Sequence, residues 1–135
     1  MLEHIGQNPE IFNNIIKEFY RICKNNSVID IRVPHPRHDD FISDPTHVRP
    51  ITILGLQLYD KNLNEKWEKM KAANTPLALI HGVNFLIKDV NYVLEKHYIE
   101  LLDKKEIDEN ELRKYISKYN NVVKEMKIKW VAIKD

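Results

Sequence analysis

The hydrophobic pattern predicts one long helix over residues 75–102, around which the rest of the chain is organised. Between Leu79 and Leu101, apolar residues recur in steps of three and four, and a second row that begins at Ile80 widens the apolar face. Thr75 is a good N-cap residue, and the proline that follows it suits a first helical position, where no N–H is needed. So broad an apolar surface is typical of a helix that is covered on most sides.

Three further elements are predicted on the N-terminal side of this helix. Asn8 followed by Pro9 indicates a helix that begins there and ends near Lys24. The β-branched stretch 28–33 predicts a strand, and the apolar run 51–59 predicts a second strand. The long segment between them is bounded by prolines and is expected to be a loop.

The remaining segments predict two more helices and a third strand. A short helix is expected over residues 60–74. Asp108 and Glu111 have the spacing of a capping box, which predicts the start of a helix that continues to Met126. The stretch 127–134 alternates between apolar and polar residues over its first half, as a half-buried strand does.

Together these elements predict an α+β fold. We expect a small, mostly antiparallel three-stranded sheet packed on a long antiparallel helical hairpin, plus an N-terminal helix. A chain of 135 residues fits a single domain, 1–135, with residues 34–50 as a loop insert between the first two strands. A sheet of this kind leaves two edges, which can pair with a second copy of the chain.

Composition narrows the classes of function. The net charge of +1 provides no global field that would attract nucleic acid or an anionic membrane. Charged residues interrupt the long apolar segment, so it is not expected to span a membrane, and no secretory signal is recognised. A single cysteine suits a reducing compartment, and we expect a cytoplasmic protein. Only five of the 21 basic residues are arginine, a bias typical of AT-rich genomes such as those of low-GC bacteria or their phages.

The loop insert 34–50 and the strand before it carry most of the candidate chemistry. Arginine presents a fixed fork that suits phosphate and carboxylate groups, and histidine adds hydrogen-bond donors near neutral pH. Prolines restrict the loop and reduce the entropy that it loses on binding a ligand. The candidate ligand-binding residues are Arg32, His35, Arg37, His38, His47 and Arg49. The alternative is that nearby aspartates neutralise these groups and that internal ion pairs and turns use all of them.

No catalytic residue, bound metal or cofactor is expected. His35, His38, Asp39, Asp44 and His47 are residue types that bind first-row metals, but their spacing matches no known metal motif. A glycine-rich phosphate loop and a nucleophile elbow are both absent. Basic residues between Arg113 and Lys134 alternate with aromatic ones, which can indicate a nucleic-acid face. Acids before a helix and bases at its end also complement the helix dipole without any partner.

The leading hypothesis is therefore a small non-enzymatic binding or assembly protein. It would act as a homo-oligomer through the Arg/His/Pro-rich loop and a sheet edge. Three alternatives stay open: a pocket protein that binds a phosphate-bearing small molecule or nucleotide through Arg32, Arg37 and Arg49, a metal-dependent hydrolase, and a nucleic-acid binder that uses the C-terminal basic face. The expected partners are a second copy, another protein or a phosphate-bearing ligand, and not a membrane.

Overall fold

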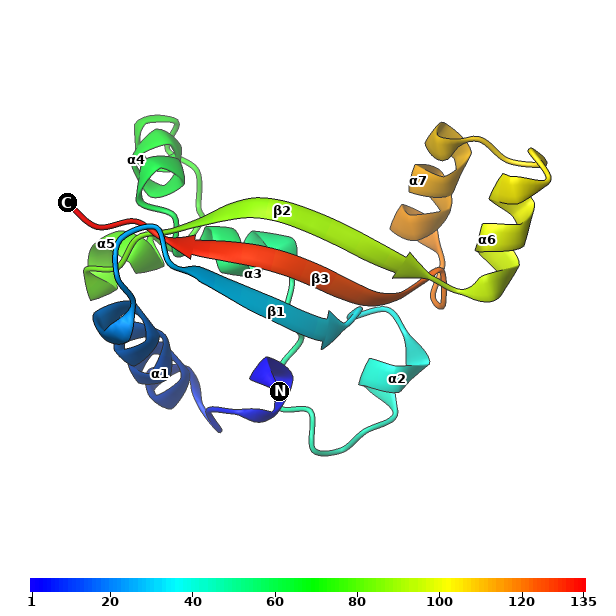
Figure 1. The fold of residues 1–135 in the computed structure, drawn as a ribbon. Coiled ribbons are helices and arrows are strands. Elements are labelled where there is room, and N and C mark those ends of the chain that lie inside the picture. Colours follow the sequence, from blue (N-terminus) through cyan, green and yellow to red (C-terminus); the bar gives the residue numbers. More distant parts are fainter.

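A three-stranded antiparallel sheet forms the centre of the computed structural model, which describes residues 1–135 (Figure 1). The strand order is β1-β3-β2, so β3 (Val123–Ala132) lies between β1 (Val28–Pro34) and β2 (Phe85–Leu94). Both neighbouring pairs run antiparallel. The predicted α+β class and antiparallel sheet are therefore confirmed.

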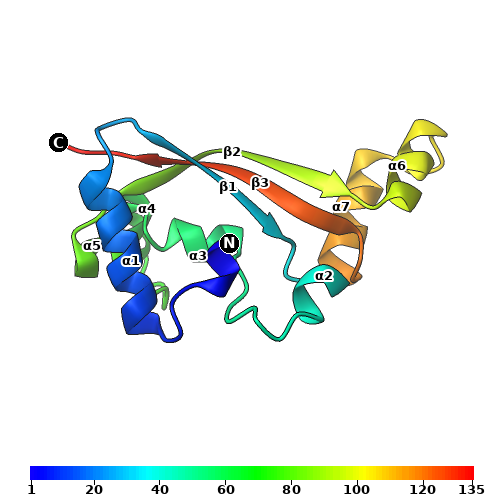
Figure 2. The ribbon, with the colours of Figure 1, turned by 60° about the horizontal axis from the view of Figure 1, so that its bottom comes forward.

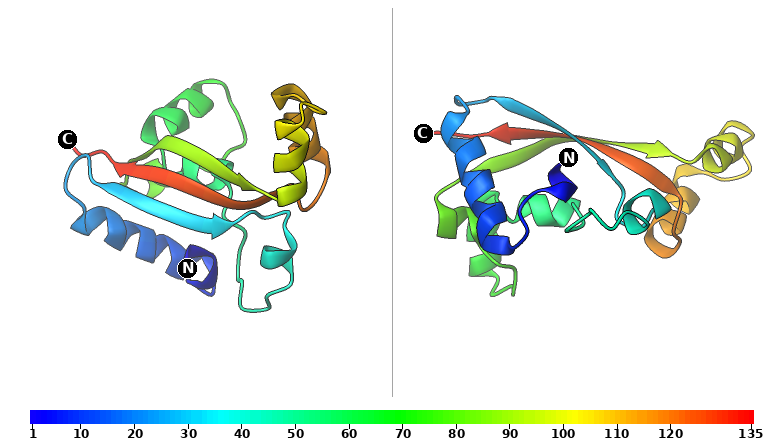
Figure 3. Two further views of the ribbon diagram at one scale, coloured as in Figure 1. Left: turned by 45° about the vertical axis from the view of Figure 1, so that its right-hand side comes forward. Right: turned by 90° about the horizontal axis from the view of Figure 1, so that it is seen from below.

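The helices are mostly short. They are η1 (Leu2–His4), α1 (Pro9–Ile22), α2 (Asp39–Ile42), α3 (Ile53–Gln57), α4 (Lys61–Lys69), α5 (Leu77–His81), α6 (Lys96–Asp103) and α7 (Glu109–Lys118). Figures 2 and 3 show η1, α1 and α3 on one side of the sheet, and α6 and α7 together at the far end of β2 and β3. The opposite side of the sheet carries no helix. None of the helices has the length and apolarity that crossing a membrane requires.

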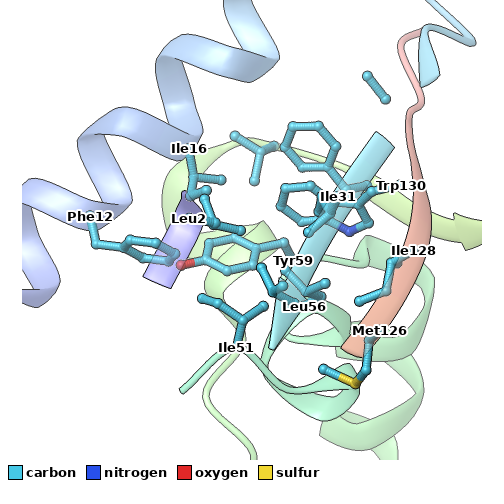
Figure 4. Packing of buried hydrophobic residues seen from close by; sticks show 14 of the residues in the cluster. Leu2, Phe12, Ile16, Ile31, Ile51, Leu56, Tyr59, Met126, Ile128 and Trp130 are labelled. Atoms are coloured by element: carbon cyan, nitrogen blue, oxygen red, sulfur yellow. The ribbon is translucent and has the colours of Figure 1, made fainter. Parts of the chain in front are cut away.

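The central strand alternates between the core and solvent. Its core-facing side chains are Met126, Ile128, Trp130 and Ala132, each at most 2% exposed, whereas Lys127 and Lys129 between them are exposed. Trp130 stacks on Phe85 with ring centroids 3.9 Å apart, and Tyr59 meets Trp130 edge-on at 5.8 Å. Figure 4 shows Leu2 and Ile16 reaching this cluster from η1 and α1. Burial of such large aromatic groups stabilises the fold by about 2–3 kcal/mol each.

The prediction of one long helix over 75–102 is wrong. The segment forms α5, then β2, then α6, and Gly82 ends α5 in the left-handed conformation (φ 66°). A β-bulge lies between Ile87 and Asp89, so the step between the core-facing residues Ile87 and Val90 is three instead of two. The bulge gives one step of three in β2, and the exposed Leu86 (44%) adds an apolar position on the other face, so the predicted apolar rows do not mark one buried side. The expected helical hairpin does not form.

The prediction of a strand over 51–59 is also wrong, because this segment contains α3. The hydroxyl of Thr52 accepts a hydrogen bond from the Gly55 N–H (2.9 Å) and caps the helix. Leu56 and Tyr59 are buried, three residues apart, as on one face of a helix. A short apolar run fits both the helical and the strand period, and here the Thr52 cap and the packing of Leu56 and Tyr59 favour the helix.

The prediction that the helix after Asp108 continues to Met126 is wrong as well. The helix begins as predicted, with the Asp108 carboxylate accepting from the Glu111 N–H (2.8 Å), but it ends at Lys118. Asn121 has a positive φ of 62° and turns the chain into β3, which includes Met126. Asparagine tolerates this backbone conformation better than most residues, so the turn replaces the predicted helical continuation.

The predicted helix caps and two of the predicted strands are confirmed. Asn8 caps α1 by accepting from the Ile11 N–H (2.9 Å), and Asp60 caps α4 by accepting from the Leu63 N–H (3.1 Å). The predicted strand 28–33 corresponds to β1, and the predicted strand 127–134 overlaps most of β3.

Asn64 provides a test of how α4 is attached to α5. Its side chain is buried, donates to the Leu58 carbonyl (3.0 Å) and accepts from the N–H groups of Ala78 (3.0 Å) and Leu79 (3.3 Å). Asn64→Ala is expected to lower the free energy of unfolding by about 2–4 kcal/mol, because it removes these bonds. Chemical denaturation measures the change. The exposed neighbour Asn62 is the control, and Asn62→Ala should cost less than about 0.5 kcal/mol.

Candidate functional site

The six predicted ligand-binding residues do not converge on one place. Arg32 lies on β1, on the sheet face without helices, and forms an ion pair with Glu125 of β3. His35 follows β1, where its Nδ1 accepts from the Arg37 N–H (3.1 Å) and its ring meets Tyr92 edge-on. Both side chains are therefore engaged within the chain.

Arg37 and His38 connect the 34–50 segment to the far end of the sheet. The Arg37 guanidinium donates to the Ser117 carbonyl at the end of α7. His38 is 5% exposed and caps α2, since its Nδ1 accepts from the Asp40 N–H (3.0 Å). Because Nδ1 accepts, Nε2 carries the proton, which it donates to the Glu95 carboxylate just after β2.

His47 and Arg49 connect the same segment to the N-terminal residues. The Arg49 guanidinium donates to the carbonyls of Ile5 (3.1 Å) and Gly6 (2.5 Å) and lies 4.1 Å from the centre of the Phe12 ring. The His47 ring stacks on Phe41, and its Nδ1 lies 2.7 Å from the Phe41 carbonyl oxygen. The segment is thus held at both of its ends by the groups that were expected to bind ligands.

This placement matches the alternative in which internal contacts use the loop's charged groups. Arg32 lines a hollow beside β1, and Arg49 lines a separate cavity between α1 and α3. Arg37 lies at the opposite end of the sheet, next to α7. Binding of a phosphate-bearing ligand by these three arginines stays a prediction, and their positions supply no common pocket for it.

Sequence reasoning missed the hollow beside β1. It has a volume of about 320 Å³ and eight hydrophobic residues among the ten that line it: Met1, Leu2, Ile5, Phe19, Ile29, Asp30, Ile31, Arg32, Val33 and Trp130. The indole N–H of Trp130 is buried and has no hydrogen-bond partner. Buried donors are normally paired, and this one is an exception within the core that is not open to the hollow. The apolar lining by itself makes the hollow a candidate binding surface.

The hollow lies at a free sheet edge. The His35 N–H donates to the Lys124 carbonyl (3.0 Å), which identifies the odd-numbered residues of β1 as those bonded to β3. The N–H and C=O groups of Val28, Asp30 and Arg32 therefore point away from the sheet. The other edge is different, because β2 has a bulge and its Phe85 N–H donates to the Tyr59 carbonyl (2.9 Å). Only β1 offers a regular, unpaired edge.

The sheet face without helices carries part of the predicted basic surface. Lys127 and Lys129 point to this face from β3. Lys129 lies 3.6 Å from the Asp30 carboxylate and is opposite Asp89 in the β2 register. These acids reduce the positive potential of the face, and nucleic-acid binding stays a prediction without a supporting contact.

His35 supplies a prediction about pH. Burial lowers the pKa of His35, the positive charge of Arg37 lowers it further, and a proton on His38 would act in the same direction. The folded protein therefore binds a proton at His35 less readily than the unfolded chain, in which the pKa of His35 has its ordinary value of 6.5. Stability is retained above that pH and falls as the pH drops below it, by at most about 1.4 kcal/mol per pH unit for one group. His35→Gln should reduce the loss of unfolding free energy between pH 7.5 and pH 5.5.

The measurement is urea denaturation at both pH values, with His97→Gln as the control. His97 is exposed on α6, so its replacement should leave the pH dependence close to that of the parent protein. A His35→Gln variant with the parent's full pH dependence would contradict the assignment.

Comparison with known protein families, curated proteins and solved structures finds no significant match to this chain. Function is therefore inferred from the contacts and geometry described above.

Proposed function

We propose that this protein is a small non-enzymatic assembly protein that forms a homodimer through the free edge of β1. In the dimer, β1 pairs antiparallel with β1 of a second copy, and the 34–50 segment, which continues directly from β1, flanks the contact. The observation that carries the proposal is the charge pattern of the free edge. Asp30 and Arg32 have opposite charges and belong to the residues whose backbone groups are unpaired. Both stay exposed beside Lys129 and Glu125 of β3, which they face within the chain.

The charge pattern is self-complementary in one register only. When the two-fold axis passes through Ile31, Asp30 of each copy lies opposite Arg32 of the other. These positions also form hydrogen-bonded pairs, because both have outward-pointing N–H and C=O groups. An axis at Asp30 or at Arg32 would instead place like charges opposite each other, which is unfavourable. A two-fold axis of this kind is the commonest symmetry of homo-oligomers.

The apolar hollow supports the same contact. It runs along five consecutive residues of β1 and is otherwise lined by Met1, Leu2, Ile5 and Phe19 from the N-terminal segment and α1, and by Trp130 of β3. A strand added to the edge would cover part of this lining and remove it from water. The bulge and the capped start of β2 disfavour the opposite edge as the site of pairing.

A charge-reversal series tests the proposal. Asp30→Arg places two arginines opposite each other across the contact, and Arg32→Asp places two aspartates opposite each other. Each variant should weaken dimerisation about ten-fold or more, since two symmetry-related pairs change from attraction to repulsion. The double variant Asp30→Arg/Arg32→Asp restores opposite charges and should recover most of the affinity. Sedimentation equilibrium over a range of concentrations gives the dissociation constants.

The control is Asp89→Arg. Asp89 lies opposite the same Lys129 but on β2, so this variant removes an acid from the same face without changing the β1 edge. This variant should have a dissociation constant within about two-fold of the parent value. A parent protein that stays monomeric at millimolar concentration would refute the proposal, and so would a double variant as weak as the single ones.

A further inference from the structure

Three side chains with metal-binding atoms meet where η1 contacts the 34–50 segment. Glu3, His4 and His47 each place one such atom within 4.8 Å of the other two. The Nε2 atoms of His4 and His47 lie 3.6 and 3.9 Å from the same oxygen, Glu3 Oε1. We propose that these three residues bind a divalent first-row transition-metal ion, with Asp44 beside it. This site is separate from the β1 edge and does not depend on dimerisation.

The hydrogen bonds of both imidazole rings leave Nε2 available. His47 Nδ1 lies 2.7 Å from the carbonyl oxygen of Phe41, and His4 Nδ1 lies 3.2 Å from that of Thr46. A carbonyl oxygen can only accept, so each Nδ1 carries a proton and each neutral ring has a lone pair on Nε2. Histidine ligands of metals are oriented in this way, with the second nitrogen donating to a carbonyl or carboxylate.

The carboxylate near the two Nε2 atoms is buried. The side chain of Glu3 is 6% exposed, and its Oε2 accepts from the Met1 amino group (2.8 Å), which leaves Oε1 directed at the two rings. The distances of 3.6 and 3.9 Å from Oε1 to the two Nε2 atoms are too long for hydrogen bonds. Asp44 Oδ2 lies 3.6 Å from His47 Nε2 and adds a second carboxylate. A cation between these atoms would neutralise the carboxylates and accept the lone pairs.

The spacing suits a small metal ion. Ligand atoms about 2.0–2.1 Å from a tetrahedral zinc ion lie about 3.3 Å from one another. The two distances to Glu3 Oε1, 3.6 and 3.9 Å, would have to shorten by about 0.3–0.6 Å. The ligand atoms of the two histidines, which lie within 4.8 Å of each other, would have to approach by up to about 1.5 Å. Two imidazole nitrogens and a carboxylate oxygen form a donor set typical of zinc, iron or manganese, whereas calcium and magnesium prefer oxygen alone.

The two segments that carry the ligands are already held together. The Val48 N–H donates to the Glu3 carbonyl (2.8 Å), and the Arg49 guanidinium binds the carbonyls of Ile5 and Gly6. Glu3 and His4 are therefore fixed against the 44–47 turn by bonds that do not involve the ligand atoms. The ligand residues are therefore already close together before a metal ion binds. A bound ion would add a further connection between the N-terminus and the loop.

Zinc is the probe for the test. The full-length protein, freed of any affinity tag and treated with chelator, is titrated with Zn²⁺ by isothermal calorimetry, and its melting temperature is measured with and without the ion. We expect one zinc per chain and a rise in melting temperature, because binding to the folded state stabilises it. With Co²⁺ the site should give visible absorption bands of a four- or five-coordinate ion.

His47→Gln and Glu3→Gln should each weaken zinc binding more than ten-fold and abolish the rise in melting temperature. His97→Gln is the control, since His97 is exposed on α6 outside the cluster. If His47→Gln fails to fold, the decisive variant is His4→Gln, whose parent side chain is 39% exposed. Zinc affinity unchanged in the ligand variants, reduced equally in His97→Gln, or absent in the parent protein up to millimolar concentration would overturn the proposal.

Discussion

The fold depends on the double pairing of β3. This strand satisfies its backbone groups on both sides, through β1 and β2, and it places Trp130 and its alternate neighbours against the helices. Its two partners are separated from it and from each other by long stretches of chain, so the sheet forms only when distant segments meet. The stacking of Trp130 on Phe85 joins β2 to β3 at the centre of the core, and Tyr59 closes the cluster from the end of α3. Because β3 is paired on both sides, the outer edges of the sheet belong to β1 and β2.

The segment between β1 and α3 acts as a connection between two ends of the molecule. At one end, Arg37 and His38 bind α7 and the residue after β2; at the other, Arg49 binds the backbone after η1. Ordering a long loop costs conformational entropy, and the charged groups offset this cost with hydrogen bonds to backbone carbonyls and to a carboxylate. The arginine and histidine residues of this segment thus have structural roles.

The two proposals rest on different parts of this arrangement. The β1 edge is available because β1 is the outer strand and its Asp30 and Arg32 alternate with core-facing residues. The cluster of Glu3, His4 and His47 exists because the loop returns to η1. The edge is proposed as a surface for a second polypeptide, whereas the cluster of Glu3, His4 and His47 is proposed as a small site for a metal ion. Each proposal can hold without the other.

The sequence by itself determined the features that depend on near neighbours. Asn8, Asp60 and Asp108 cap helices where expected, because capping involves atoms only two or three residues apart. The β-branched composition of residues 28–33 and the alternation that begins at residue 127 also identified the strands β1 and β3. The role of the 34–50 loop was recognised only in part, since its residue types indicated anion binding and the contacts that engage them lie far away in sequence.

Only the tertiary structure decided the rest. The 75–102 segment contains two short helices with a strand between them, and in that strand a bulge and apolar residues on both faces hide the alternation. Pairing of β2 with β3 outweighs the local preference. The pattern of residues 51–59 fits a helix or a strand, and the burial of Leu56 and Tyr59 in the core favours the helix. Glu3 and His47 are far apart along the chain, so no spacing rule could associate them. Contacts of this kind are a property of the folded arrangement of β1, β3 and the loop, and a linear pattern does not contain them.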